Sequence, residues 1–245
     1  MRKLTFGLRA GRLAVLACTL ALSTLATAGA TGASASTAVS PALTAPPSIG
    51  VLWFPTPNAG EQCGNGAPSQ WATSPNWTTP ILIDTDSRPG GCRLAFGIYD
   101  PANALAGLTV AYTWQVSPGG DAGQCQDPTT GMNQGTYSMP IAPFQTFGTS
   151  VLDDTDNRLG YCNLTFTVSG RNDIGLDLQF YQTPQGNGQC VGGLPQGIPL
   201  TASAGSPVTI GLDTDARVGG CYLSLRLEHF GFGPNHNITA AAHMR

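Results

Sequence analysis

Residues 84–94 read DTDSRPGGCRL, residues 154–164 read DTDNRLGYCNL and residues 213–223 read DTDARVGGCYL. One pattern, Asp-Thr-Asp-x-Arg-x-Gly-x-Cys-x-Leu, therefore occurs three times, and in each copy the first Asp precedes the Cys by eight residues. Internal similarity of this kind indicates a structural unit that is copied and stacked. We therefore expect three tandem repeats.

Alternating apolar and polar residues follow each motif cysteine. A period of two over six residues is typical of a half-buried β-strand. Two further strand-like stretches precede each motif, and a stretch interrupted by proline could form a fourth, edge-type strand. The four expected strands of the three units are 49–54, 70–74, 81–83 and 93–98; 108–116, 137–142, 151–152 and 163–168; and 176–181, 198–203, 208–212 and 222–227. We expect the strands on either side of each motif loop to form a hairpin.

The fold class expected from these patterns is all-β, because no segment has a sustained helical period. Units of about 60 residues would each have a marginal core, which favours three units sharing one core. A pseudo-threefold, β-trefoil-like barrel is the first expectation, and tandem small β-sandwiches are the second. The repeat domain spans residues 48–245, with units at about 48–106, 107–174 and 175–245.

The cysteine count predicts a disulfide framework. Seven cysteines occur, and Cys18 lies in the leader, so six remain, an even number. Each unit has an upstream cysteine in a second recurring motif that runs from Thr-Pro or Ser-Pro to Gln-Cys. Bridges within units would join Cys63 to Cys92, Cys125 to Cys162, and Cys190 to Cys221. The alternative links neighbouring units, with Cys92 to Cys125, Cys162 to Cys190, and Cys63 to Cys221 closing the ring.

The N-terminus and the charge balance predict a secreted protein. Residues 1–36 have a basic start, a short apolar run and small-residue cleavage sites, which are the features of a signal peptide. Residues 37–47 form an Ala/Pro/Thr-rich flexible segment. Beyond the signal, fourteen acidic and seven basic residues give a formal charge of −7, and no lysine remains. This balance argues against nucleic acid as a partner, and no apolar run is long enough for membrane insertion. The Ala- and Gly-rich leader suggests a bacterial source.

The repeated acidic motif is the first candidate site. A calcium loop would need an oxygen ligand where arginine stands and glycine at the next position, so no metal is expected. An Asp–Arg pair with a structural role is one interpretation, and contact with a ligand is the other. Trp71 and Trp77 add possible stacking platforms. The candidate ligand-binding residues are Asp84, Asp86, Arg88, Asp154, Asp156, Arg158, Asp213, Asp215, Arg217, Trp71 and Trp77.

The function favoured by the sequence is binding without catalysis. Repeated acids suit repeated pockets better than one asymmetric active site, and bridged cysteines cannot serve as nucleophiles; a hydrolase with two catalytic carboxylates stays open. We expect a secreted carbohydrate-binding protein without a cofactor, whose partner is a glycan or an extracellular protein. The alternative is a secreted protease inhibitor or disulfide-stabilised interaction protein.

The C-terminal tail generates two further expectations. His229, His236 and His243 lie too far apart for the usual histidine pair of a zinc site, so a solvated tail is expected. Residues 237–242 stand where the earlier units begin a strand, and we expect them to form a closing strand.

Overall fold

The computed structural model describes residues 45–56, 63, 69–83, 91–153, 159–185, 188–213 and 219–230. These residues form strands, turns and one short 3-10 helix, η1, so the all-β prediction is confirmed. The signal segment, the expected closing strand at 237–242 and two of the three tail histidines lie outside the described residues. Among the described residues, no helix has the length and apolar character that crossing a membrane requires.

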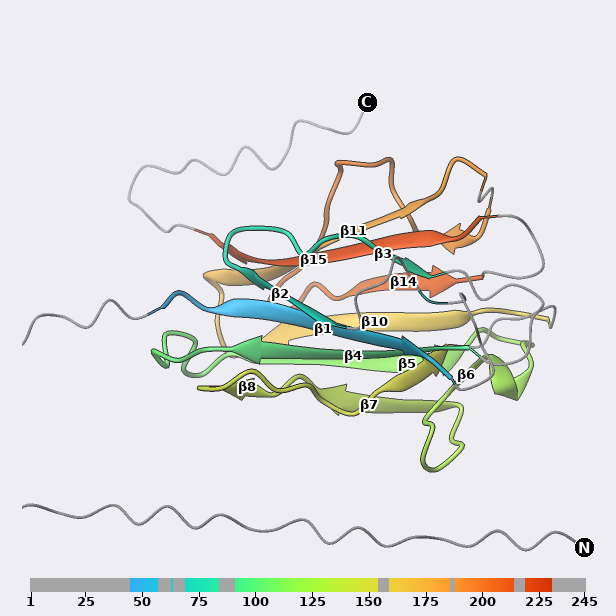
Figure 1. Cartoon of the computed structure of the whole chain (residues 1–245), viewed down its shortest axis with the longest axis horizontal. Coiled ribbons are helices and arrows are strands. Elements are labelled where there is room, and N and C mark those ends of the chain that lie inside the picture. The colour runs from blue at the N-terminus through green and yellow to red at the C-terminus, as the bar shows by residue number, and fades with distance from the viewer. Residues whose placement is uncertain are drawn as a thin grey trace, which may run out of the picture. The chain divides into compact units, whose positions relative to one another are not determined.

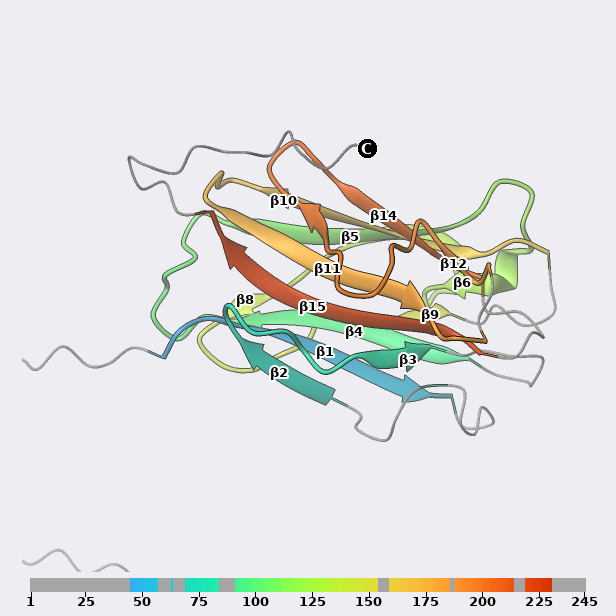
Figure 2. The ribbon, with the colours of Figure 1, turned by 90° about the horizontal axis from the view of Figure 1, so that it is seen from above.

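Fifteen strands and η1 follow one another along the described part of the chain. Their bounds are β1 Ser48–Pro55, β2 Ser69–Thr73, β3 Ile81–Ile83, β4 Cys92–Tyr99, β5 Thr109–Val116, η1 Ala122–Gln124, β6 Cys125–Gln126, β7 Gln134–Ser138, β8 Ile141–Ala142, β9 Val151–Asp153, β10 Cys162–Ser169, β11 Ile174–Gln182, β12 Cys190–Val191, β13 Leu200–Ala202, β14 Val208–Leu212 and β15 Cys221–His229. The long strands run in nearly the same direction or its reverse (Figures 1 and 2).

The strands form three sheets and no closed barrel. Sheet A has the order β2-β1-β4-β9-β6, with β8 added beside β4. Sheet B has the order β13-β11-β15-β3, and sheet C has the order β12-β14-β10-β5-β7. A barrel requires one sheet that closes on itself. The trefoil-like barrel expected from the sequence is therefore not what the described residues form.

The expected hairpins across the motif loops are wrong. Strand β3 pairs with β15, whereas β4, which follows it in the chain, pairs with β9. In the same way β9 and β10 lie in sheets A and C, and β14 and β15 lie in sheets C and B. The strands on either side of each motif loop thus lie in different sheets. Each sheet also contains a strand from another unit: sheet A has β9 of the second unit, sheet C has β14 of the third, and sheet B has β3 of the first. The units are therefore not independent sandwiches.

One buried cluster unites the three sheets, as the shared-core expectation requires. Phe96 of sheet A packs edge-on against Tyr112 and Phe166 of sheet C, with ring centroids 4.9 and 5.3 Å apart. Sheet B contributes Leu176 and Leu225, both fully buried in the same cluster. Edge-to-face rings and close-packed aliphatic chains are the arrangement expected of a protein core.

The three disulfides join cysteines within units, as predicted. They are Cys63–Cys92, Cys125–Cys162 and Cys190–Cys221. Disulfides persist in oxidising compartments, so the bridges indicate an oxidising environment for this chain.

A segment of the first unit closes the edge of sheet B. The backbone N–H of Thr78 donates to the carbonyl of Leu225 at 2.9 Å, and its hydroxyl accepts the N–H of Leu225 at 2.9 Å. Further along, the hydroxyl of Ser74 donates to the carbonyl of Leu227 at 3.0 Å. Because Thr78 is 2% exposed, these bonds are shielded from water, and they cover a strand edge that would otherwise be open.

Thr78→Val should therefore lower the melting temperature. Valine keeps the shape of threonine but leaves the buried N–H of Leu225 without an acceptor, at a cost of about 1–3 kcal/mol. Thermal unfolding followed by circular dichroism measures the change. Thr79→Val, at the exposed neighbour, is the control and should have little effect; equal melting temperatures for the two variants would contradict the closure.

Candidate ligand-binding groove

Most of the repeated motif lies outside the described residues. This holds for Asp84, Asp86, Arg88, Asp154, Asp156, Arg158, Asp215 and Arg217. Asp213 is described and follows β14, where its backbone N–H donates to the carbonyl of Gln189 at 2.9 Å. The roles of the motif acids as ion-pair partners or ligand contacts thus stay predictions.

Trp71 is part of the packing on the outer face of sheet A. It lies in β2 directly across from Gly50 of β1. A side chain at Gly50 would come within 2.7 Å of the Trp71 ring, so the absence of a Cβ there makes room for the indole. The centroid of the Phe147 ring lies 4.9 Å from that of the Trp71 ring. Trp71 therefore packs on the sheet beside a loop residue and is not a free platform.

Trp77 packs against a charged cluster on sheet B. The guanidinium of Arg226 lies 4.6 Å from the centroid of the Trp77 ring, a cation–π distance. Arg226 also donates from Nε and Nη2 to Oδ2 of Asp177, at 2.9 and 2.8 Å. The hydroxyl of Thr201 donates to Oδ1 of the same carboxylate at 2.6 Å. Only 3% of the Asp177 side chain is exposed, so these bonds hold a buried charge.

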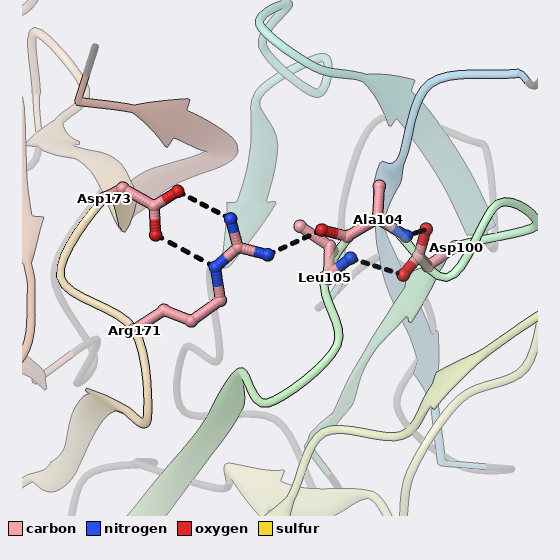
Figure 3. Close-up of polar contacts among 5 residues, drawn as sticks. All are labelled: Asp100, Ala104, Leu105, Arg171 and Asp173. Atoms are coloured by element: carbon pink, nitrogen blue, oxygen red, sulfur yellow. Dashed lines mark hydrogen bonds and ion pairs between the residues drawn. The ribbon is translucent and has the colours of Figure 1, made fainter. Parts of the chain in front are cut away.

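A second Asp–Arg pair connects the loops that follow β4 and β10 (Figure 3). Arg171 binds Asp173 through two nearly parallel bonds, at 2.9 and 2.5 Å, and donates to the carbonyl of Ala104 at 2.5 Å. Asp100 accepts the backbone N–H groups of Ala104 and Leu105 at 2.9 and 2.8 Å. The hydrogen bonds lower the pKa of Asp173 from its ordinary value, with the Arg171 bond as the largest cause. This network fixes the two loops relative to each other.

A groove of about 790 Å³ lies on sheet B, near the disulfide Cys190–Cys221. Its floor comes from β11 and β15, one wall from the segment before β3, and the other wall from the turn after β12. None of its described lining residues carries a formal charge. They are Thr79, Pro80, Tyr181, Gln182, Thr183, Pro184, Cys190, Gly193, Leu194, Pro195, Gln196 and Tyr222.

Two tyrosines pair on the floor of the groove. Tyr181 of β11 lies across from Tyr222 of β15, and their ring centroids are 5.2 Å apart. Burial raises the pKa of Tyr181 above its ordinary value, the nearby Tyr222 adds to the rise, and a hydrogen bond from Gln196 opposes it. The Gln196 amide lies 3.5 Å from the Tyr181 hydroxyl. The Tyr181 phenol therefore stays neutral at physiological pH.

Polar groups around the tyrosines are held by backbone contacts. The side-chain oxygen of Gln182 accepts the N–H of Gly188 at 3.1 Å. The hydroxyl of Thr183 accepts the N–H of Gly220 at 3.1 Å. An apolar, aromatic surface with a few fixed donors and acceptors is the usual make-up of a small-ligand site.

The aromatic pair is particular to sheet B. The corresponding positions are the residue after each motif cysteine and its partner on the paired strand. In sheet A they hold Arg93 and Phe54. In sheet C they hold Gln115 and Asn163. The described groove is thus not repeated in kind on the other sheets, and the expectation of similar repeated pockets gains no support from it.

The two floor tyrosines are the signal in the sequence that could have pointed to this groove, although neither was among the predicted site residues. Tyr222 is an outward position of the alternating strand 222–227, and Tyr181 closes the stretch 176–181. The pairing of the two strands within one unit would have placed both tyrosines side by side. The wall formed by Thr79 and Pro80 could not be predicted, because it comes from a segment about 100 residues earlier in the chain.

Searches against protein-family models, curated proteins and solved structures found no match to this chain.

The two Asp–Arg pairs differ in burial and should therefore differ in their contribution to stability. Asp177→Asn removes the buried carboxylate that Arg226 and Thr201 bind, and we expect a loss of about 1–3 kcal/mol in the free energy of unfolding. Asp173→Asn, in the more exposed pair with Arg171, is the matched control and should change little. Urea denaturation of both variants measures the difference; a larger loss for Asp173→Asn would contradict the assignment.

Proposed function

We propose that this chain is a secreted, non-enzymatic binding protein whose groove on sheet B takes a neutral carbohydrate. The observation that carries the proposal is the Tyr181–Tyr222 pair on the floor of a groove whose described lining is uncharged. Sugar rings present apolar C–H faces that pack on aromatic rings, and hydroxyls that bond to amides and phenols. The groove offers both kinds of contact.

The lack of charge in the described lining favours neutral glycans over anionic ones. A sulfated or uronic acid-containing chain would give up hydration of its charges without gaining an ion pair in return, which is unfavourable. Neutral oligosaccharides carry no such cost. Neutral chains such as cellohexaose and chitohexaose are therefore the ligands that the groove suits best.

The secreted state and the arrangement of the units belong to the same proposal. The signal-like residues 1–36 and the three bridges support export. The same strand-pairing pattern recurs in all three sheets, for example where Cys92, Cys162 and Cys221 each lie across from a strand of another unit. That recurrence supports a pseudo-threefold arrangement of three repeats.

A second candidate is binding of an extended, proline-rich peptide of an extracellular protein. Pro80, Pro184 and Pro195 lie around the tyrosine pair, and grooves lined by aromatic residues are common receptors for the polyproline II conformation. This candidate belongs to the class of disulfide-stabilised interaction proteins. The two candidates can be distinguished by experiment, because binding to peptides and binding to glycans are measured on separate panels.

The function is tested by screening the full-length exported protein against neutral glycans, anionic glycans, proline-rich peptides and a panel of proteases. Hits among neutral glycans support the proposal. Hits confined to peptides would replace it with the second candidate, and inhibition of a protease without glycan binding would make the chain an inhibitor. Turnover of any glycan would show that it is an enzyme.

Tyr181→Gln and Tyr222→Asn test the groove itself. Glutamine and asparagine occupy the corresponding positions in sheet C, so the same type of strand pair accommodates them. We expect glycan affinity to fall by about tenfold to a hundredfold, since aromatic anchors are worth about 1.4–3 kcal/mol. Titration calorimetry measures the loss. Phe54→Gln, at the corresponding place in sheet A, is the control; an equal loss there would move the site away from the groove.

Binding in the groove should not depend on pH between about 5 and 9. Tyrosine is the ionisable side chain of the described lining, apart from the bridged Cys190, and the pKa of Tyr181 lies above its ordinary value of 10.0. Tyr181 therefore keeps its proton across this range, and a neutral glycan does not change its charge. Affinities measured at several pH values check this. A midpoint within the range would show that a titrating group takes part.

A further inference from the structure

The bridge Cys190–Cys221 stands apart from the other two by its position. Cys190 is half-buried and lines the groove. Each of the other five bridged cysteines is buried, with Cys63 at 8% and the remaining four fully enclosed. Thiol–disulfide exchange requires access to a sulfur. Cys190 is therefore the natural point of attack among the six.

The same bridge holds one wall of the groove. Residues 188–196, which we name the lip, supply Cys190, Gly193, Leu194, Pro195 and Gln196 to the lining. Apart from the bridge, the lip is held by non-covalent contacts. Gln189 is fully buried and its carbonyl accepts the N–H of Asp213, while Gly188 and Gln196 bond to Gln182 and Tyr181 of the strand β11. Strand β12 pairs with β14 over two residues, and the N–H of Leu194 donates to the carbonyl of Phe180 at 2.9 Å. The turn at Gly193 packs directly on Cys190, so movement of Cys190 moves the wall.

The bridge also reaches the floor. Its second cysteine, Cys221, directly precedes Tyr222 in β15. The wall that carries Gln196 and the floor that carries the tyrosine pair are thus covalently joined at one corner of the groove. Breaking the bridge would remove the covalent link between the lip and the floor and leave the hydrogen bonds to β11 as their connection, while the buried bridges of the other units remain closed.

We infer that Cys190–Cys221 is a thiol-sensitive latch for the groove, an inference that rests on the proposed binding function. A dithiol reductant attacks the Cys190 sulfur, which forms a mixed disulfide and releases Cys221 as a thiol. The second thiol of the reductant then displaces Cys190 and closes its own disulfide. Two electrons and two protons pass from the dithiol to the protein. The lip separates from Tyr222, and the ligand loses one wall of its site.

The first test follows the order of reduction in the full-length protein. The protein is titrated with dithiothreitol, free thiols are trapped with iodoacetamide, and the modified cysteines are identified by peptide mapping. We expect Cys190 and Cys221 to be modified before the other four, by about tenfold in rate. Earlier modification of Cys63 and Cys92, or simultaneous modification of all six, would overturn the inference. This measurement needs no ligand.

The second test uses paired variants. Cys190→Ser with Cys221→Ser should speed amide hydrogen exchange of the lip by about tenfold or more and leave the exchange of β4 and β10 unchanged. Cys125→Ser with Cys162→Ser is the control, which should lower overall stability without singling out the lip. Unchanged lip exchange in the first variant would refute the latch.

Binding of cellohexaose and chitohexaose is measured on the same variants and on the native protein. Faster exchange of the lip with binding retained also refutes the latch. No binding by the native protein refutes the proposed function instead.

Discussion

A closed belt of alternating strand pairs and disulfides connects the whole fold. Cys92 lies across from Asp153, which also lies across from Cys125, and Cys125 is bridged to Cys162. The same step leads from Cys162 through Leu212 to Cys190, and from Cys221 through Ile83 back to Cys63. Each disulfide thus joins a cysteine that pairs with one sheet to a strand of another sheet. Breaking any link opens a ring that otherwise restricts all three sheets at one end.

The recurring Thr-Pro and Ser-Pro motifs gain a role from this belt. The hydroxyls of Thr56, Ser117 and Thr183 each accept the backbone N–H of the residue just before a motif cysteine, at 3.0–3.2 Å. Their own N–H groups donate back to the carbonyl of that same residue, at 2.9–3.0 Å. Two reciprocal bonds therefore fix where each bridged strand begins. Serine or threonine is required for this clamp, which explains why the motif accompanies the cysteines.

Strands and bridges could be predicted from the sequence because both are encoded locally. Period-two alternation placed β4, β10 and β15, and the pairing of each Gln-Cys cysteine with its own motif cysteine proved correct. Strand partners could not be predicted, because the three apolar residues of β3 do not by themselves specify a neighbour; in the structure β3 pairs with β15, next to the bonds between Thr78 and Leu225. The groove was missed for the same reason: its floor is local, but Pro80 and Leu194 come together only in the folded chain.

The outer faces of the three sheets differ in side chains, although the belt is the same in all three. At the residue after each motif cysteine and the residue paired with it, sheet A has an arginine 5.7 Å from a phenylalanine ring, sheet C has two amides, and sheet B has two tyrosines. These side chains point away from the core, so their replacement leaves the belt and the buried cluster intact. A scaffold that is fixed by bridges and strand exchange can therefore change its outer faces independently. In this chain, the uncharged groove with its tyrosine pair lies beside the bridge whose Cys190 is half-buried, so the proposed binding site and the proposed latch share one corner of sheet B.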